Sequence, residues 1–360
     1  MRLISNIFLI LVSLSVLSCF KEDDAVVPIL PYHGTIMSSG EQADPTYRHQ
    51  LWFDLSSGTA KQTERNVWDL GFYSGNEFRV ILNTSLLMAA APIEGVTELE
   101  QVNSEMVEEL KNFVRVADFN TDNSIYVDKL NGDYLNDGTV IAEISANPDE
   151  NKVYLLNLGR RNYSGNILPD TAYPAGGNRG WKKIKILREG ADAYRIQYAD
   201  LDATEHNEFV IHKNPAYNFV FFSVQNEVIA DAEPLKQNWD FCYTVFTNVV
   251  EGAGTYIFSD YIMTNNLAGV GAYKVMVLGG EDPELVYNDF KKSDIDASKF
   301  VYNDHTIIGD DWRDVFSNVY GDRFFILKNP EGKYFKLRFI RFKDDAGYRG
   351  FMQFEFTALD

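Results

Sequence analysis

WDLGFY at residues 68–73 returns in altered form as WDFCYT at residues 239–244. The two Trp-Asp pairs lie 171 residues apart, and KVYLLN (152–157) returns at the same spacing as RFFILK (323–328). Two separate motifs that repeat at one constant spacing indicate an internal duplication. Propeller repeats have periods of about 40 to 45 residues, so the Trp-Asp pairs do not mark propeller blades.

The residues around these motifs alternate between apolar and polar, which predicts strands. A further strand candidate precedes each Trp-Asp pair, HQLWFDL (49–55) in the first copy and NFVFFSV (218–224) in the second. The second copy closes with a hairpin whose turn is NPEG at 329–332. Aromatic residues make up 14% of the chain, which suits pleated strands. We therefore expect an all-β protein of mostly antiparallel sheets with a few short helices.

The closing hairpin of the first copy is longer than that of the second. An insertion at 157–180, rich in Gly, Asn and Pro, separates its first strand from the return strand GWKKIKIL (180–187). HKNPAY (212–217) then interrupts two strand candidates and marks the boundary between the copies. The sequence predicts a first unit at 46–213 and a second at 214–360.

Two stretches predict short helices in the connections. SEMVEELKNFVRVA (104–117) has Ser104 as a candidate N-cap and an apolar stripe at helical spacing. DPELVYNDF (282–290) has Asp282 as the cap and Pro283 at the first helical position.

The N-terminus predicts a bacterial lipoprotein. An apolar run follows Arg2, and the small residue Ser18 precedes Cys19, so residues 1–18 form a signal peptide and Cys19 carries the lipid. An uncleaved membrane anchor is the alternative, but about fifteen apolar residues are short for a span. Residues 19–45 form the tether. Its acidic start resembles the export signal of surface-exposed bacterial lipoproteins, which favours the outer cell surface over the periplasmic face of the outer membrane.

The charge excludes one class of partner. The chain carries 33 basic and 52 acidic residues, a net charge of −19. Such a protein is repelled by phosphate backbones and by anionic lipid, so nucleic-acid binding is excluded and membrane contact runs through the lipid anchor alone. Cys242 is the only cysteine besides Cys19. With Cys19 committed to lipid, we expect Cys242 to be a small core residue.

Taken together, the lipidated cysteine, the Trp-Asp strand leading to RVILN (79–83), and the closing hairpin FFILKNPEGKYFKLRF (324–339) resemble the HmuY-type haem-binding lipoproteins. The chain resembles two such units in tandem, with the framework residues Trp68, Asp69, Trp239 and Asp240 in matching positions. The resemblance implies an all-β protein on the outer membrane that captures haem and passes it to a TonB-dependent receptor. It also implies His or Met ligands to iron from loops between the framework strands.

Three residues are candidates for the iron ligands. His305 lies in the connection before the closing hairpin, and Met263 and Met276 follow the second Trp-Asp strand, which are regions where this family places ligands. His and Met are both established ligands of haem iron. Each residue also has an ordinary interpretation, a solvated loop side chain for His305 and a core filler for either Met.

Other chemistries find less support in the sequence. DFNTDNS (118–124) alternates oxygen donors as a calcium loop does, but Asn123 replaces the diagnostic Gly and Lys129 the diagnostic Glu, which favours a simple turn. The chain has no GxSxG, HExxH or P-loop motif. The sequence thus predicts a non-enzymatic lipoprotein that sequesters haem. A surface binding or adhesion lipoprotein without haem, and an enzyme acting on surface polysaccharide, remain the alternatives.

Overall fold

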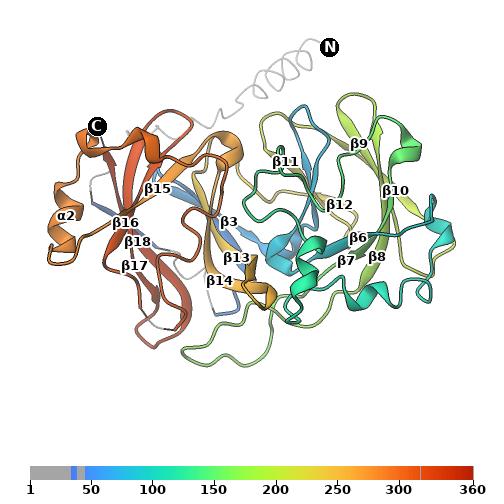
Figure 1. The fold of residues 1–360 in the computed structure, drawn as a ribbon, viewed down its shortest axis with the longest axis horizontal. Helices are drawn as coiled ribbons and strands as arrows, with labels where there is room; N and C mark the ends of the chain where they lie inside the picture. The colour runs from blue at the N-terminus through green and yellow to red at the C-terminus, as the bar shows by residue number, and fades with distance from the viewer. Residues whose placement is uncertain (1–33, 39–44, 317, 360) are drawn as a thin grey trace, which may run out of the picture. The chain divides into compact units, whose positions relative to one another are not determined.

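Four antiparallel sheets make up the fold, as the alternating sequence pattern predicts (Figure 1). The computed structural model describes residues 34–38, 45–316 and 318–359, and all of them belong to one compact unit. Two of the sheets have five strands and two have four. The expected all-β class is therefore confirmed.

The two five-stranded sheets repeat one plan. Their strand orders are β10-β9-β8-β7-β6 and β1-β18-β17-β16-β15, so each runs as a meander along the chain apart from the N-terminal strand β1. The strands of the first are β6 (Ala89–Pro92), β7 (Val153–Asn157), β8 (Trp181–Glu189), β9 (Ala193–Ala199) and β10 (Asn207–His212). Those of the second are β1 (Thr35–Ser38), β15 (Gly271–Met276), β16 (Arg323–Lys328), β17 (Tyr334–Lys343) and β18 (Arg349–Leu359). Both predicted closing hairpins, β7–β8 and β16–β17, are confirmed.

The two four-stranded sheets each combine strands from both sequence copies. Their orders are β12-β11-β4-β5 and β14-β13-β2-β3. The first contains β4 (Leu70–Tyr73), β5 (Val80–Leu82), β11 (Phe219–Ser223) and β12 (Val228–Ala230). The second contains β2 (His49–Asp54), β3 (Thr59–Glu64), β13 (Phe241–Val250) and β14 (Gly254–Thr264).

Hairpins are therefore exchanged between the copies. The β2–β3 hairpin of the first copy pairs with β13, and the β11–β12 hairpin of the second copy pairs with β4. The predicted units 46–213 and 214–360 thus each carry a hairpin that completes a sheet of the other. We propose that they are the two copies of a duplicated unit that have exchanged these hairpins.

The Trp-Asp pairs fasten the exchanged hairpins. The buried carboxylate of Asp69 accepts a hydrogen bond from the backbone N–H of Gln225 (3.1 Å), in the turn between β11 and β12. In the other copy, Asp240 accepts from the backbone N–H of Leu55 (2.7 Å), in the turn between β2 and β3. Each Asp thus satisfies a turn that belongs to the opposite copy.

A buried asparagine completes this arrangement in each copy. Asn83 donates its side-chain amide to the carbonyl oxygen of Trp68, and Asn265 donates to that of Trp239, both at 2.9 Å. The backbone N–H of each asparagine bonds to the carbonyl oxygen of the Asp that follows the tryptophan. The Trp-Asp motif is therefore held from two sides in the same way in both copies.

Each four-stranded sheet packs on one five-stranded sheet to form a sandwich. In one sandwich Phe53 and Phe241 contact Phe354 of β18, with both pairs of ring centroids 5.2 Å apart. In the other, Phe72 contacts Tyr194 of β9 at 5.1 Å. Figure 1 shows the two four-stranded sheets between the five-stranded ones, so their remaining faces are turned toward one another.

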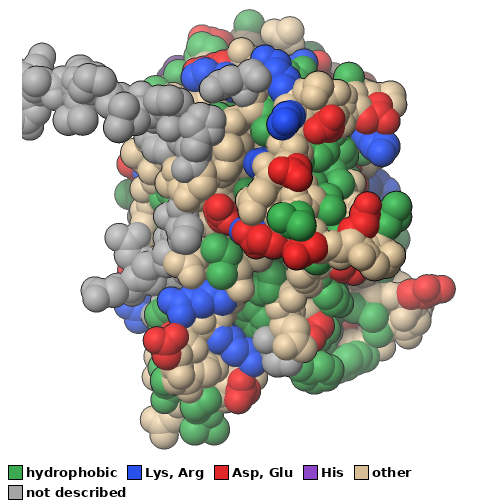
Figure 2. All heavy atoms as spheres, turned by 90° about the vertical axis from the view of Figure 1, so that its left-hand side faces the viewer, with side chains coloured by type: hydrophobic (Ala, Val, Ile, Leu, Met, Phe, Trp, Pro, Cys, Tyr) green, Lys and Arg blue, Asp and Glu red, His purple; other side chains and the backbone are tan. Residues whose placement is uncertain are grey.

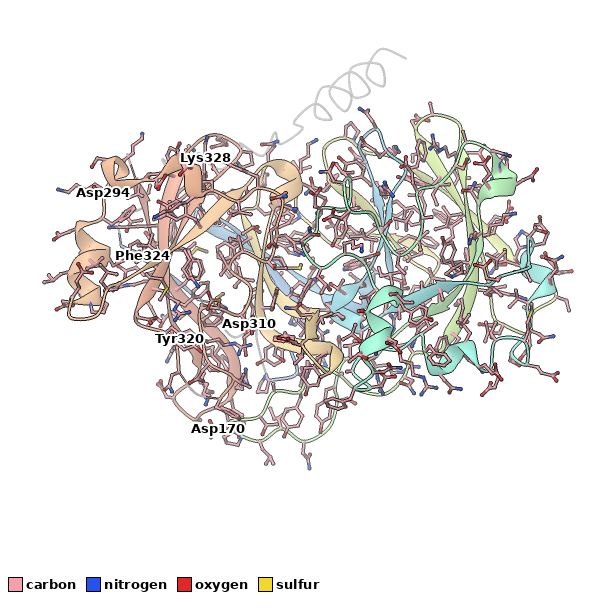
Figure 3. All side chains as sticks on the ribbon, viewed as in Figure 1. Asp170, Asp294, Asp310, Tyr320, Phe324 and Lys328 are labelled. Carbon is pink, nitrogen blue, oxygen red and sulfur yellow. The ribbon has the colours of Figure 1, made fainter. Side chains whose placement is uncertain are left out.

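The insertion in the first closing hairpin crosses to the other sandwich. Asp170 forms an ion pair with Lys343 (2.7 Å), and its backbone N–H bonds to the carbonyl of Gly347 in the β17–β18 turn (Figure 3). Near the other end of the insertion, Arg179 forms a buried ion pair with Asp69 (2.6 Å). The insertion therefore connects the Trp-Asp motif of one copy to the last hairpin of the other.

Helical structure is sparse. The predicted helix after Asp282 is confirmed as α2 (Pro283–Asp289), and the carboxylate of Asp282 accepts from the N–H of Glu284 (2.9 Å). The predicted helix over 104–117 is wrong, because only η5 forms there and Met106 and Phe113 are each about half exposed. The 3-10 turns are η2 (Arg65–Val67), η3 (Thr84–Leu86), η4 (Leu99–Gln101), η5 (Leu110–Asn112), η6 (Thr121–Tyr126), η7 (Pro148–Glu150), η8 (Asn266–Ala268), η9 (Lys292–Asp294) and η10 (Ala297–Lys299).

The predicted signal peptide (1–18) and the lipidated Cys19 lie outside the described residues, as does most of the tether. Within the described part of the chain, no helix is long and apolar enough to cross a membrane.

The two Trp-Asp carboxylates differ in their charge partners, which predicts unequal effects of substitution. Asp69→Asn leaves the buried guanidinium of Arg179 without its carboxylate, and we expect a loss of about 3 kcal/mol in the free energy of unfolding. Asp240→Asn keeps an acceptor for Leu55, and burial already raises the pKa of Asp240 to about 7, so we expect a loss of about 1 kcal/mol. Urea unfolding at pH 7 measures both values, and equal losses would contradict this account.

Candidate binding site

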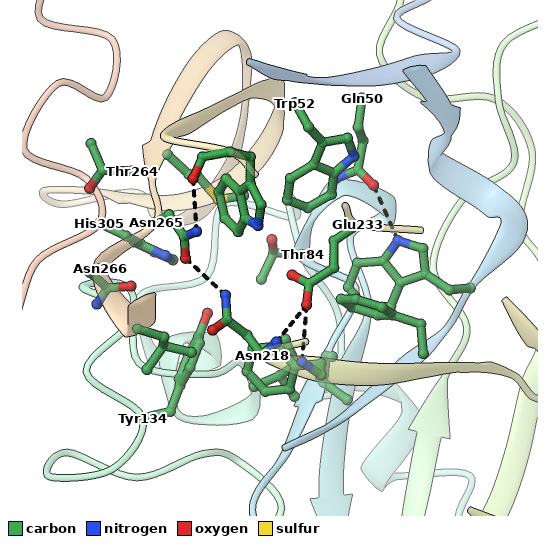
Figure 4. A pocket seen from close by; sticks show the side chains of 18 residues that line it. Gln50, Trp52, Thr84, Tyr134, Asn218, Glu233, Thr264, Asn265, Asn266 and His305 are labelled. Atoms are coloured by element: carbon green, nitrogen blue, oxygen red, sulfur yellow. Dashed lines mark hydrogen bonds between the residues drawn. The ribbon is translucent and has the colours of Figure 1, made fainter. Parts of the chain in front are cut away.

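A crevice lined by aromatic rings lies between the facing four-stranded sheets (Figure 4). On one side Trp52 and Trp239 meet edge to face, with centroids 4.7 Å apart and planes at 81°. On the other side Trp68 and Phe221 meet in the same manner, at 4.5 Å and 62°. The crevice is therefore bounded on both sides by pairs of aromatic rings in edge-to-face contact.

Strand alternation explains how these rings reach the crevice. In β2, Leu51 and Phe53 enter the sandwich core while Gln50 and Trp52 face the crevice. In β11, Phe222 enters the core while Phe219 and Phe221 face the crevice. Both faces of each strand are thus buried, which is why consecutive residues of these strands are apolar instead of alternating with polar ones. These consecutive apolar residues are the feature of the sequence that could have indicated a covered second face.

One carboxylic acid and one free donor are present among these rings. Glu233 is 3% exposed, and one of its oxygens accepts from the backbone N–H groups of Asn218 (2.8 Å) and Phe219 (3.1 Å). Burial raises the pKa of Glu233 to about 8. The indole Nε1 of Trp239 is buried and has no hydrogen-bond partner among the described residues. These two groups are available to a ligand.

The amide side chains of the crevice are largely committed to its walls. Gln50 accepts from the indole N–H of Trp68 (3.1 Å), and Asn218 donates to Asn265 (2.8 Å). The second bond links the two four-stranded sheets, because Asn218 precedes β11 and Asn265 follows β14. Among the described residues, no Lys or Arg lines the crevice.

The crevice is small, but it adjoins a larger groove. Its volume is about 70 Å³, compared with roughly 300 to 1,000 Å³ for typical small-molecule pockets. A neighbouring groove of about 310 Å³ runs along the β11–β12 hairpin and shares Phe219, Phe221 and Glu233 with the crevice. A thin wall of three side chains therefore separates the two spaces.

His305 lines the crevice but is held by the loop beneath it. Its ring Nε2 lies 2.7 Å from the carbonyl oxygen of Leu130, and its ring meets that of Tyr134 edge to face. A Cβ atom placed on Gly132 would lie 2.4 Å from Nδ1, so this second nitrogen is tightly covered. Burial lowers the pKa of His305 to about 4, which makes the imidazole neutral at pH 7. The alternative of a solvated loop histidine is therefore wrong.

The two methionine candidates lie in different places. Met263 lines the crevice and packs on Trp52, Trp239 and Cys242, and Cys242 is fully buried as expected. Met276, at the end of β15, is 44% exposed and is not part of the crevice. The structure thus brings His305 and Met263 to one site and leaves Met276 outside it.

The possible calcium loop is an ordinary turn. The side chain of Asn120 accepts from the backbone N–H of Asp122 (3.0 Å), and Asn123 directs its oxygen to the N–H of Thr255 (3.0 Å). In the part of the chain that the structure describes, no three His, Cys, Asp or Glu side chains gather as a metal site.

Sequence reasoning missed Tyr134 and Glu233. Tyr134 comes from a loop without strand periodicity, and burial raises its pKa well above the ordinary value. Glu233 is one of 52 acidic residues, and nothing local in the sequence distinguishes it from a solvated one.

The buried Glu233 predicts a stability that falls as pH rises. Its pKa is about 8 in the folded protein and near 4.5 in the unfolded chain, so the folded state holds the additional proton between these values. This group therefore lowers the free energy of unfolding from pH 5 to pH 8, by at most about 1.4 kcal/mol per pH unit. We expect Glu233→Gln to flatten that slope in urea unfolding.

Asp231→Asn is the matched control, because this neighbouring carboxylate is 81% exposed. Asp128 and Asp240, whose pKa values are also raised to about 7, contribute slopes of the same sign and keep some pH dependence in every variant. An unchanged slope in Glu233→Gln would refute the assignment of a buried, protonated acid.

A protein-family model described as HmuY protein matches residues 46–356 of the chain. The matched segment contains both Trp-Asp motifs and both closing hairpins, so the resemblance carried by these residues is confirmed. No curated protein and no solved structure matches the chain.

Proposed function

Because the chain belongs to the HmuY family, we propose that it is a non-enzymatic protein that binds haem where the crevice and the adjoining groove meet. The observation that supports this proposal is the aromatic crevice with His305 and Met263 on its wall. Aromatic faces bury a flat macrocycle, and a neutral imidazole or a thioether binds its iron. Sequestration requires no catalytic group.

A macrocycle requires the crevice to open into the groove. The intervening wall consists of Phe219, Phe221 and Glu233, next to the three-residue edge strand β12. In the described structure β12 pairs with β11 alone, and the segment after it is linked across to β3 by the ion pair of Lys61 with Asp231 (2.5 Å). Displacement of this short edge joins the two spaces. Burial of the porphyrin faces then contributes roughly 25 cal/mol per Å² of apolar surface to the free energy of binding, before the cost of ordering side chains and loops is subtracted.

The proposed iron ligands also depend on this displacement of β12. His305 becomes a ligand when its ring leaves the carbonyl of Leu130, and Met263 reaches the iron from β14. Since no described Lys or Arg lines the crevice, the carboxylates of haem remain at the mouth, in water.

Haem titration of the mature protein tests this proposal. We expect a shifted and sharpened Soret band, and His305→Ala and Met263→Ala each weaken binding about tenfold or more through loss of an axial ligand. Met276→Ala is the matched control, because this methionine lies outside the crevice and should leave the affinity unchanged. Equal effects of all three substitutions, or no spectral change at micromolar haem, would count against haem at this site.

We further propose that the protein is a lipoprotein of the outer membrane, exposed at the cell surface, that passes haem to a TonB-dependent receptor. The support is the Ser18-Cys19 pair after the apolar run and the acidic start of the tether.

Lipidation is tested in cells by labelling with a palmitate analogue. Cys19→Ser should abolish the label and release the protein from the membrane fraction, whereas Cys242→Ser should retain both. Surface exposure is tested by adding a protease to intact cells, which should digest the wild-type protein. Label on Cys19→Ser protein would overturn the anchor assignment.

A binding or adhesion lipoprotein without haem is the second candidate. Its support is the closed state of the crevice, with about 70 Å³ of space and both ring nitrogens of His305 already in contact with the loop over 130–132.

A further inference from the structure

The closed crevice has the attributes of a small-ligand site in its own right. Aromatic pairs in edge-to-face contact bound it on two sides, and its volume of about 70 Å³ is nearer to the size of a small ligand than to that of a macrocycle. Within it, one oxygen of Glu233 and the indole N–H of Trp239 remain unused by the described residues. Glu233 holds its proton in the unliganded protein and becomes a partner for a cation when it releases that proton, so the two groups suit a cation that also offers an acceptor to the indole N–H.

The walls favour a cation. Trp52, Trp68 and Trp239 all line the crevice, and the face of an indole is the strongest aromatic partner for a cation within about 6 Å. Rings inclined at 81° and 62° present faces and edges from several directions, as aromatic cages that bind methylated ammonium groups do. A hydrated inorganic ion gains less, because aromatic walls do not replace its water.

The charges agree with this selectivity. Glu233 is the only acidic side chain that lines the crevice among the described residues, and Figure 4 shows it pointing between the two aromatic walls. The nearest amine, that of Lys61, bonds to the backbone oxygen of Glu233 and pairs with Asp231, outside the lining. The net charge of −19 draws cations to the protein, and the face in Figure 2 shows acidic side chains interspersed with basic ones.

Comparison of the two copies separates ligand features from framework features. The tryptophans and aspartates of the Trp-Asp pairs occur in both copies, as their structural role requires. The segment before each Trp-Asp pair repeats at a spacing of 169 residues, because Phe53 pairs with Phe241 and Phe222 pairs with Leu70. At that spacing Glu233 corresponds to Glu64, which is exposed at the end of β3, so the two acids share a position in the repeat but only Glu233 is buried.

We propose that the crevice, widened by a shift of the side chains that it shares with the adjoining groove, binds a small quaternary ammonium compound that carries a hydroxyl group, of the choline class. The methylated ammonium lies among the three indoles next to Glu233, which releases its proton when the cation binds, and the hydroxyl oxygen accepts from the N–H of Trp239. Choline binding requires no haem, but the two ligands share the crevice.

Calorimetric titration of haem-free mature protein with choline chloride, at constant ionic strength set by NaCl, tests the proposal. The neutral isostere 3,3-dimethylbutan-1-ol has the same shape without the charge, and we expect it to bind at least about tenfold more weakly. Intrinsic fluorescence provides a second signal, because three of the five tryptophans line the crevice.

Two substitutions locate the binding. Glu233→Gln should weaken choline at least about tenfold, while the control Asp345→Asn, a carboxylate that is 99% exposed and lines neither the crevice nor the groove, leaves it unchanged. Trp239→Phe should remove the preference for choline over tetramethylammonium, which lacks the hydroxyl.

Three outcomes would overturn the assignment. These are equal binding of the neutral isostere, binding of glucose in place of choline, or an unchanged choline affinity in Glu233→Gln. Haem plays no part in these titrations, so failure of the haem proposal leaves them intact. If both ligands bind, choline should raise the apparent dissociation constant of haem, because the two share the crevice.

Discussion

The capping of each exchanged hairpin by a buried aspartate is the constraint on which the structure depends. Asp69 and Asp240 lie at the start of strands in their own copy but satisfy backbone N–H groups in a turn of the other. A buried carboxylate without such partners is costly, so neither hairpin can leave its sheet alone. The capping therefore holds each exchanged hairpin in the sheet that it shares with the Trp-Asp strand of the other copy.

Much of the fold follows from local sequence pattern, but the pairing of strands does not. Alternation and turn residues predict the strands, the two closing hairpins and the helix after Asp282. The repeat makes the hairpin exchange hard to predict. Residues 49–55 and 218–224 have similar patterns, so the sequence does not tell which of them pairs with which Trp-Asp strand. The choice between them is made by tertiary contacts such as the link between Asn218 and Asn265. The helix expected over 104–117 fails because only part of its apolar stripe is buried: Val114 packs in a core cluster, whereas Met106 and Phe113 are each about half exposed.

The only site residues that could be predicted from the sequence are those whose residue type itself suggests iron ligation. His305 and Met263 were singled out as soft ligands and do share a crevice, whereas Met276, equally plausible by type, lies elsewhere. Glu233 and Tyr134 matter because of burial, and burial of a loop residue depends on which elements pack over it. The duplication explains why the crevice is aromatic on both sides, and the copies differ in that Glu233 is buried while its counterpart Glu64 is exposed.

The hairpin exchange also governs how the chain reaches its native state. Strand β2 finds its partner β13 only about 190 residues later in the chain, a separation that slows folding through the entropy of loop closure. During synthesis or export from the N-terminus, β2 and β3 emerge long before β13, with a hydrophobic face uncovered. A protein of this topology depends on being held unfolded, or guarded against aggregation, until most of its length is available.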